Sequence, residues 1–322
     1  MKAFVYREYG ATDVLKLDNV EKPTPKDGEI VVRVRAVSLN KADLYFLKGE
    51  PFMLRLENGL QKPKRTILGA DISGVVEAVG KNVNQFKLGD EVFADLSSSG
   101  LGGLAEYVCA KESAFAHKPT NLSHEEAAAA PMAAVTALQS LKKGNIKAGQ
   151  KVLINGASGG VGTFAVQIAK SFGAEVTAVC SSKHIEIARA LGADYTIDYN
   201  KENFTKNGKR YDLILATNGY HTLADYKRAL TTNGVYVCSG GALKQIFESI
   251  LLGSLATIGT NKKMTNLSAK PNQDDLIFVK QLIESGKVKS FVEKTYPFEQ
   301  TPEAFRHLAQ GHASGKIVIK IS

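Results

Sequence analysis

The sequence predicts an α/β protein that combines a doubly wound parallel sheet with a second, mostly β domain. Three observations support this prediction. The length of 322 residues suits two domains of ~150 residues each. Short runs of alternating apolar and polar residues fill positions 1–122, which is typical of strands joined by turns. From Lys151 onward, strand-like and helix-like segments alternate, as in a parallel sheet with crossover helices.

The composition is that of an ordinary globular protein, with 44% hydrophobic and 23% charged residues. No apolar run approaches the ~18 residues of a membrane span, and the N-terminal residues contain no signal-peptide core. Cys109, Cys180 and Cys238 are too few and too widely spaced for a disulfide framework or a metal cluster. We therefore expect a protein of the reducing cytoplasm without a membrane span.

The chain is basic, with 41 lysines and arginines against 32 acidic residues and a net charge of +9. The densest basic sets, residues 62–65 and Lys262–Lys263, are not interleaved with aromatic residues, and no nucleic-acid-binding module is recognisable. The sequence therefore predicts no nucleic-acid partner. A solvated basic surface that also favours an anionic cofactor accounts for the charge.

The first domain is predicted from three alternating segments, Glu29–Val37, Ile72–Gly80 and Gly89–Ala94. The pattern changes at Ser123, which begins a capping box, and the Ala-rich residues 127–141 are expected to form a helix. Further strands are predicted at Val152–Asn155, Glu175–Cys180, Tyr195–Asp198, Leu213–Thr217, Val235–Ser239 and Leu255–Gly259. Helices are predicted between them at Gly160–Phe172, Lys183–Leu191 and Leu223–Leu230.

The C-terminal part departs from this alternation. It predicts a helix, a strand, a helix and a strand at Gln273–Ser285, Lys294–Phe298, Pro302–Gln310 and Lys316–Ile321. We expect this tail to return to the first domain. The first domain is then discontinuous, over residues 1–122 and 263–322, and the parallel-sheet domain is inserted over residues 123–262.

A glycine-rich turn follows the strand Val152–Asn155 and opens an amphipathic helix. Glycines permit the tight turn and let backbone N–H groups approach a pyrophosphate, and the helix N-terminus adds partial positive charge. The A-x-G-x-x-G frame therefore predicts dinucleotide binding by Ala157, Ser158, Gly159, Gly160, Val161 and Gly162. The turn also contains a G-x-S-x-G match, so Ser158 is a formal candidate for a hydrolase nucleophile, although no downstream pattern marks a partner histidine.

The end of the next strand indicates which nicotinamide cofactor fits. NAD sites usually place Asp or Glu there, whereas this chain has Ser181, Ser182 and Lys183. Two hydroxyls and an ammonium suit a 2′-phosphate, so we expect NADPH rather than NADH. Ser181 can also cap the following helix, and the two roles are compatible.

A catalytic zinc is not predicted. The six histidines show no H-x-x-H spacing and the three cysteines no C-x-x-C spacing. His307 and His312 belong to a late helix and its exit, where a surface position is expected.

The order of these features, and three further motifs, resemble the medium-chain dehydrogenase/reductase superfamily over essentially the whole chain. Residues Gly69–Gly80 are similar to its N-terminal signature, Leu88–Val92 to its G-D-x-V element and Gly315–Val318 to its C-terminal G-K-x-V element. The resemblance implies a Rossmann-type nucleotide domain inserted in a GroES-like domain.

The departures from the superfamily pattern indicate a branch. Zinc-dependent members carry His where this chain has Ala70 and Cys where it has Asn40, and residues 95–103 lack the cysteines of their structural zinc lobe. The chain therefore resembles the zinc-independent, zeta-crystallin-like quinone oxidoreductases. That branch implies reduction of a quinone, or of the activated C=C bond of an α,β-unsaturated carbonyl, by NADPH.

The resemblance also implies site residues. The cofactor-binding positions fall on the glycine-rich turn and on Thr136, Ser181, Ser182, Lys183, Tyr199, Asn218, Gly240, Gly241 and Lys316. The cleft segment N-x-x-D-x-Y matches Asn40, Asp43 and Tyr45. We expect Asn40 to polarise the substrate carbonyl and Tyr45 to donate to the enolate oxygen, with solvent as the alternative donor. Asp43 is at least as well explained by a structural hydrogen bond.

Other interpretations remain open at this point. One is an NAD(P)-dependent alcohol or aldehyde oxidoreductase, which the lack of a Lewis acid disfavours. Another is a non-catalytic NADPH-binding sensor, because fold does not fix function. Relatives imply a homodimer through the expected edge strand Leu255–Gly259. The apolar residues of the segment 45–66 form either a lipophilic mouth or ordinary packing.

Overall fold

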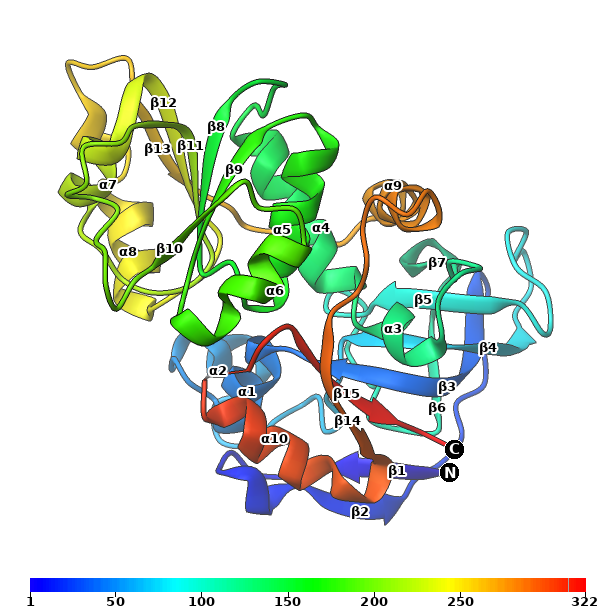
Figure 1. The fold of residues 1–322 in the computed structure, drawn as a ribbon. Helices are drawn as coiled ribbons and strands as arrows, with labels where there is room; N and C mark the ends of the chain where they lie inside the picture. The colour runs from blue at the N-terminus through cyan, green and yellow to red at the C-terminus, as the bar shows by residue number, and fades with distance from the viewer. Residues whose placement is uncertain (312) are drawn as a thin grey trace. The chain divides into compact units, whose positions relative to one another are not determined.

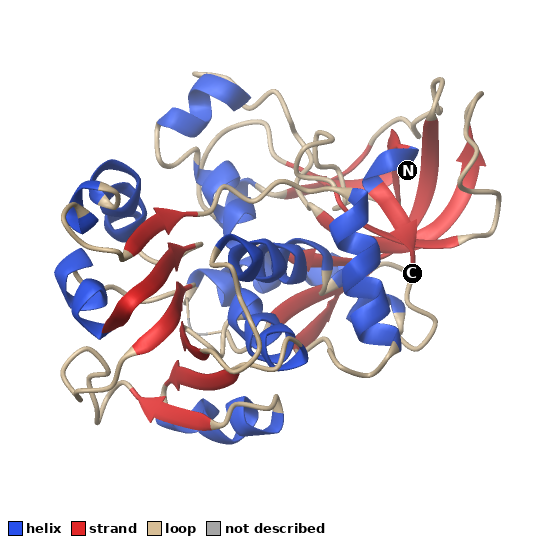
Figure 2. Ribbon diagram, turned by 90° about the horizontal axis from the view of Figure 1, so that it is seen from above, coloured by secondary structure: helices blue, strands red, loops and turns tan. Residues whose placement is uncertain are grey.

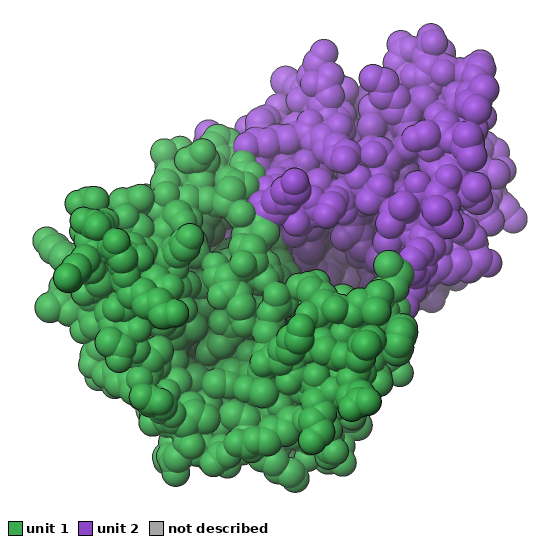
Figure 3. Space-filling view, turned by 180° about the vertical axis from the view of Figure 1, so that it is seen from behind, with its two compact units in different colours: residues 1–132, 271–284, 290–322 green, residues 133–270, 285–289 purple. Residues whose placement is uncertain are grey.

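The computed structural model describes residues 1–311 and 313–322, and Figure 1 shows it as a ribbon. The chain forms two compact units, which are coloured separately in Figure 3. Unit 1 contains residues 1–132, 271–284 and 290–322, and unit 2 contains residues 133–270 and 285–289. The expected α/β class, with one parallel and one mostly antiparallel sheet, is confirmed.

Unit 2 is built on a parallel sheet with the strand order β10-β9-β8-β11-β12-β13. Its strands are β8 (Lys151–Asn155), β9 (Glu175–Cys180), β10 (Tyr195–Asp198), β11 (Tyr211–Ala216), β12 (Leu230–Cys238) and β13 (Lys263–Asn266). The order reverses between β8 and β11, so crossover helices cover both faces of the sheet, as Figure 2 shows. This reversal is the switch point beside which open α/β sheets bind ligands.

The helices of unit 2 follow the predicted alternation. They are α4 (Pro131–Lys143), α5 (Gly160–Ser171), η3 (Ser182–His184), α6 (Ile185–Ala190), α7 (Leu223–Ala229), α8 (Leu243–Leu252) and η4 (Leu255–Thr257), of which η3 and η4 are 3-10 turns. The Ala-rich stretch expected as one helix is two, because Pro131 starts α4 and ends the preceding helix α3 (His124–Ala128). The capping box of Ser123 and Glu126 is present at the start of α3.

The prediction of a strand at Leu255–Gly259 is wrong. These residues form η4 and a turn, and the edge strand next to β12 is β13, in which only Met264 is buried. Leu255 and Ile258 are 60% and 74% exposed, so their apolar character reflects a surface and not a buried strand. Because Lys263–Asn266 pairs with β12, these residues belong to the parallel sheet, and the expected boundary before Lys263 falls too early.

Unit 1 contains the mostly antiparallel sheet, in which only β14 and β15 are described as pairing in parallel. The strands of that sheet are β3 (Glu29–Leu39), β4 (Asp71–Val79), β5 (Glu91–Asp95), β6 (Tyr107–Lys111), β7 (Phe115–His117), β14 (Val292–Pro297) and β15 (Lys316–Lys320). A separate hairpin consists of β1 (Lys2–Val5) and β2 (Lys16–Asn19). β15 pairs with β3, so the C-terminal strand returns to the sheet of the N-terminal segment.

Short helices surround this sheet. They are η1 (Thr12–Val14), α1 (Lys41–Lys48), α2 (Met53–Asn58), η2 (Glu112–Ala114), α3, α9 (Gln273–Glu284), η5 (Phe298–Gln300) and α10 (Thr301–Ala309). α3 packs on β3 and β4, so residues 123–132 belong to unit 1 and not to the inserted domain as expected. α1 follows β3 directly, which places the start of α1 at the same end of the sheet as the start of β15, where Leu39 pairs with Ile317.

Candidate functional site

The glycine-rich turn joins β8 to α5 in the predicted place. Gly156 has φ of +90°, a conformation that side chains disfavour, and a Cβ on Gly162 would lie 2.1 Å from the Gly156 carbonyl oxygen. A Cβ on Gly159 would meet only that same oxygen, at 3.6 Å, so one side of the turn is open. Gly159 is also the residue before the first turn of α5, whose free N–H groups and dipole favour an anion. The turn therefore fits a pyrophosphate group.

The other predicted residues of this sheet edge lie beside the turn. Thr217, at the end of β11, donates its hydroxyl to the carbonyl oxygens of Asn155 and Gly156 at 3.0 and 3.1 Å. A Cβ on Gly156 would lie 2.7 Å from the Cβ of Asn218, and a Cβ on Gly240 would lie 2.5 Å from the Thr217 carbonyl oxygen. The ends of β8, β11 and β12 are thus in close contact, and Asn218, Gly240 and Gly241 follow directly from them.

The end of β9 carries the residues expected to recognise a 2′-phosphate. The Ser181 side chain makes no cap bond to η3, and its Oγ lies 3.1 Å from the Nδ1 atom of His184. Ser182 donates its hydroxyl to the carboxylate of Asp198. Lys183 is exposed. The group therefore presents two hydroxyls that already have protein partners, and one ammonium for which the described residues provide none.

Asp198 is a residue that the sequence analysis missed. It ends β10, the strand beside β9, and also accepts a bond from the Asn200 backbone N–H at 3.0 Å. These hydrogen bonds hold the pKa of the Asp198 carboxyl below its usual value, and the bond from Ser182 has the largest effect. The next residue, Tyr199, is 57% exposed and donates its backbone N–H to Cys180. The short sequence I-D-Y-N at a strand end was the available signal for this acid.

Thr136 lies within α4 and is 8% exposed. Its carbonyl oxygen accepts a 2.7 Å bond from the hydroxyl of Ser140, one turn further along the helix. The position of Thr136 is therefore fixed by the helix rather than by a loop.

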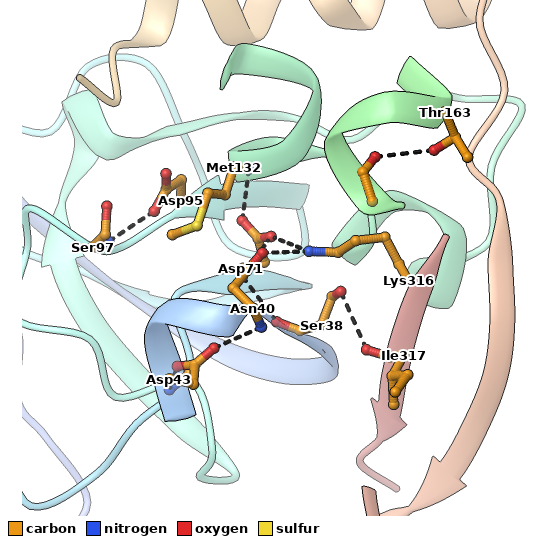
Figure 4. Close-up of polar contacts among 12 residues, drawn as sticks. Ser38, Asn40, Asp43, Asp71, Asp95, Ser97, Met132, Thr163, Lys316 and Ile317 are labelled. Carbon is orange, nitrogen blue, oxygen red and sulfur yellow. Dashed lines mark hydrogen bonds and ion pairs between the residues drawn. The ribbon is translucent and has the colours of Figure 1, made fainter. Parts of the chain in front are cut away.

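Unit 1 holds a compact polar cluster of Asn40, Asp71 and Lys316, which Figure 4 shows in close-up. The Lys316 ammonium donates to the Asn40 Oδ1 atom at 2.5 Å and to the Asp71 Oδ2 atom at 3.1 Å. The second Asp71 oxygen accepts the Met132 backbone N–H at 2.8 Å. Asp71 and Lys316 are 0% and 4% exposed at their side chains, so this is a buried ion pair. Lys316 was expected near the cofactor, and these are its partners within unit 1.

The amide of Asn40 is held at both ends. Its Oδ1 atom accepts from Lys316, and its Nδ2 atom donates to Asp71 at 3.0 Å and to the Ser38 carbonyl oxygen at 3.4 Å. Both amide hydrogens thus have acceptors within unit 1. Tyr45 lies one turn into α1 and is half-buried, with the Lys41 ammonium 5.9 Å from its ring centroid.

Asp43 holds the loop between β3 and α1. Its two oxygens accept the backbone N–H groups of Asn40 and Gly69 at 2.8 and 3.1 Å. Burial raises the pKa of Asp43 to about 6 in spite of these bonds. Burial and the nearby Asp71 carboxylate likewise raise the pKa of Asp95. The contacts of Asp43 are those of the structural role weighed in the sequence analysis.

Among the described residues, no group of three or more His, Cys, Asp and Glu side chains is arranged to hold a metal ion. His307 Nδ1 lies 3.1 Å from the Tyr296 hydroxyl, and His312 is outside the described residues. No helix in the described part of the chain is both long enough and apolar enough to cross a membrane.

Comparison with known proteins identifies the family. Residues 26–120 match the family model described as alcohol dehydrogenase GroES-like domain, and residues 191–319 match the one described as zinc-binding dehydrogenase. The chain is 36% identical to 2-methylene-furan-3-one reductase of Solanum lycopersicum, over 99% of this chain and 79% of that protein. It is 34% identical to the chloroplastic NADPH-dependent alkenal/one oxidoreductase of Arabidopsis thaliana, with the same coverage.

A solved structure agrees with these matches. The quinone oxidoreductase from Coxiella burnetii superimposes with a TM-score of 0.89 at 29% identity, over 100% of this chain and 99% of that one. The chain is thus a medium-chain dehydrogenase/reductase with the GroES-like and Rossmann-like parts of that superfamily. Within the superfamily it belongs to the zinc-independent quinone oxidoreductase branch.

Proposed function

We propose that this protein is an NADPH-dependent oxidoreductase that transfers a hydride to a quinone or to the activated C=C bond of an α,β-unsaturated carbonyl. The main support for NADPH is the end of β9, which has Ser181, Ser182 and Lys183 where NAD enzymes have a carboxylate. The names of the tomato and Arabidopsis relatives support an enone or alkenal as acceptor. Family membership also favours the dinucleotide role of the glycine-rich turn over a nucleophile at Ser158.

In this proposal, unit 2 holds the cofactor. The backbone N–H groups at the start of α5 bind the pyrophosphate on the open side of Gly159. The exposed ammonium of Lys183 binds the 2′-phosphate, and the bond from Ser182 fixes Asp198 so that its carboxylate is already satisfied. Thr136, Tyr199, Asn218, Gly240 and Gly241 complete the contacts. Bound NADPH supplies the hydride.

Unit 1 contributes the residues on the substrate side. When an enone gains a hydride at its β-carbon, negative charge develops on the carbonyl oxygen and needs a hydrogen-bond donor. Tyr45 is that donor in our proposal, and its hydroxyl then supplies the proton. Asn40 polarises the carbonyl only by giving up the bond to Ser38 or to Asp71, of which the 3.4 Å bond to Ser38 is the longer. Lys316 fixes the orientation of this amide.

The test is to follow NADPH absorbance with chelator-treated protein and a panel of quinones, enones, alkenals and simple aldehydes. Oxidation of NADPH by quinones or enones in the presence of chelator is the expected result. Turnover of simple aldehydes alone would favour an alcohol or aldehyde oxidoreductase, and binding without turnover would favour a sensor. Lys183→Met should raise the KM for NADPH about tenfold and leave that for NADH unchanged. Lys206→Met, at another exposed lysine of unit 2, is the matched control.

We also propose a homodimer, formed through the surface next to β13 and not through a strand at Leu255–Gly259. Several large apolar side chains of α8 and η4 are exposed there, namely Phe247, Ile250, Leu251, Leu252, Leu255 and Ile258. β13 is an edge of the parallel sheet and can accept a further strand. Light scattering on a size-exclusion column tests the proposal, and a monomer at micromolar concentration would contradict it.

A cytoplasmic location is part of the proposal as well. All three cysteines are free thiols, as expected in a reducing compartment. Cell fractionation with a tagged full-length chain tests it, and recovery from an organelle or the periplasm would contradict it.

A further inference from the structure

The segment that follows α1 presents an unusual apolar surface. Phe52, Met53, Leu56 and Leu60 are 63%, 65%, 64% and 57% exposed, and the first three lie at helical spacing on and just before α2. We call these four residues the α2 apolar surface. Single exposed apolar residues are ordinary, but a contiguous set on one helix face marks a surface that another apolar phase covers.

Two polar residues of the same segment, Asn58 and Arg55, make contacts with the protein instead. Asn58 is 1% exposed, donates to the Tyr6 hydroxyl at 3.0 Å and accepts the Arg65 backbone N–H at 3.1 Å. Arg55 donates to the Gly49 carbonyl oxygen at 3.0 Å, and its guanidinium lies 4.6 Å from the ring centroid of Tyr9. Met53 and Leu56 therefore point to solvent while Arg55 and Asn58 make the inward contacts, which for these four residues reverses the usual pattern of a surface helix.

These inward contacts fix the orientation of the segment. The Tyr9 hydroxyl donates to the Gly59 carbonyl oxygen at 2.7 Å, and the Lys64 backbone N–H donates to the Asn58 carbonyl oxygen at 2.6 Å. Turning the apolar residues inward would break this network and leave buried polar groups without partners. The outward direction of the α2 apolar surface is thus built into the fold of unit 1.

Exposed basic side chains occur on both sides of this surface along the chain. Lys48, Lys62 and Lys64 are exposed, and among the described residues none of them has an ion-pair partner. Glu57 is paired with Arg65 at 2.9 Å, which leaves Glu50 as the one exposed acid of residues 41–66 without an ion pair in the described structure. A second copy of the chain would bring the same lysines against one another. The charge instead complements an anionic partner.

We propose that the α2 apolar surface docks the protein on an anionic lipid bilayer. Its apolar side chains enter the headgroup and acyl boundary, and Lys48, Lys62 and Lys64 contact the anionic headgroups. An acidic protein would complement the positive charge equally well. A bilayer is favoured because the proposed acceptors, apolar quinones and alkenals, partition into it. In that respect the choice of lipid rests on the proposed function. The surface itself does not.

The test is flotation of the full chain with vesicles, without NADPH or acceptor, so that it is independent of turnover. Vesicles contain phosphatidylcholine alone or phosphatidylcholine with phosphatidylglycerol. Binding should require phosphatidylglycerol and weaken as salt is raised. The double variant Phe52→Ser/Leu56→Ser should bind at least about tenfold more weakly. Lys62→Gln/Lys64→Gln should lose about 20-fold, since each lysine near an anionic surface contributes severalfold.

Two matched controls identify the surface. Leu17→Ser/Leu88→Ser removes two other exposed apolar residues of unit 1, which are 43% and 64% exposed, and Lys201→Gln/Lys206→Gln removes two exposed lysines from unit 2. Both should bind within about twofold of the wild type. No binding of the wild type to anionic vesicles overturns the proposal. So does unchanged binding of Phe52→Ser/Leu56→Ser, or wild-type retention on immobilised polyglutamate but not on vesicles, which would indicate an acidic protein. Circular dichroism confirms that each variant is folded.

Discussion

Removing the Lys316 ammonium should destabilise unit 1 strongly, because it leaves the Asp71 carboxylate charged and buried. Asp71 is 0% exposed and would keep only the Met132 N–H at 2.8 Å and the Asn40 amide at 3.0 Å. Breaking one side of a buried ion pair costs about 3–5 kcal/mol. The two remaining hydrogen bonds place Lys316→Met near the lower end, at about 3 kcal/mol.

Removing the charge of the other partner, Asp71, should lower the free energy of unfolding by about as much. Asp71→Asn removes the negative charge and replaces one of the two carboxylate oxygens by an NH₂ group. In the wild type one oxygen accepts from the Lys316 ammonium and the other from the Met132 N–H, so the NH₂ group must face one of these donors. Both oxygens of Asp71 are acceptors, so one donor must lose its partner, at about 3 kcal/mol with the unpaired ammonium included. The double variant Lys316→Met/Asp71→Asn leaves no buried charge in this pair. It should cost only about 3 kcal/mol in total, against about 6 kcal/mol for the two single changes added together, which gives a coupling free energy of about 3 kcal/mol.

Urea unfolding followed by far-ultraviolet circular dichroism measures these free energies, since the chain contains no tryptophan. The matched control is the pair of Lys22 and Glu77, also in unit 1, with a similar separation of 2.9 Å but side chains 44% and 38% exposed. Lys22→Met and Glu77→Gln should couple by less than about 1 kcal/mol. A coupling at Lys316 and Asp71 no larger than this would refute the reasoning that burial makes the pair strong.

Three further predictions follow from the site and its surroundings. Tyr45→Phe should lower kcat/KM with an enone about 10²-fold, and an unchanged value would make solvent the proton donor. Gly159→Ala should fold normally but lose NADPH binding in fluorescence titrations, whereas Gly162→Ala should destabilise unit 2 by about 3 kcal/mol, since its Cβ would lie 2.1 Å from a carbonyl oxygen. Burial lowers the pKa of His124, whose Nδ1 lies 2.8 Å from the Ser73 hydroxyl. The unfolded chain therefore binds this proton first, and stability should fall as pH drops through about 6.5 towards the folded value. His124→Gln should flatten that fall in urea midpoints, and an equal slope in both proteins would contradict it.

The sequence predicted the glycine-rich turn and the parallel sheet because both depend on local chemistry. Gly156 and Gly162 occupy places where backbone conformation or close approach excludes a side chain, and such positions can be recognised from spacing alone. The edge strand β13 was missed because one buried residue, Met264, gives no usable alternation. The more apolar Leu255 was preferred, although its hydrophobicity belongs to an exposed surface.

The polar cluster could not be predicted for a different reason. Lys316 and Asp71 are 245 positions apart, and their contact depends on β15 lying antiparallel to β3 beside β4. The bond from Ser182 to Asp198 likewise depends on the pairing of β9 with β10. Motif matching assigned Lys316 to the cofactor, but partners for a buried charge come from the register of the sheet, which no local pattern contains.

The polar cluster of Asn40, Asp71 and Lys316 leads us to predict how the protein responds to added zinc. Zinc-dependent members of the superfamily carry His and Cys where this chain has Ala70 and Asn40, and here the Asn40 Oδ1 atom lies 2.5 Å from the Lys316 ammonium. Zn²⁺ prefers thiolate, imidazole and carboxylate ligands, whereas Ala70 offers no ligand atom and the Asn40 oxygen already accepts a bond from a cation. Added Zn²⁺ should therefore neither raise the melting temperature nor remain bound after dialysis. If zinc stays bound at one ion per chain and Asn40→Ala releases it, then Lys316 moves to admit the metal and the cluster is not the fixed ion pair described above.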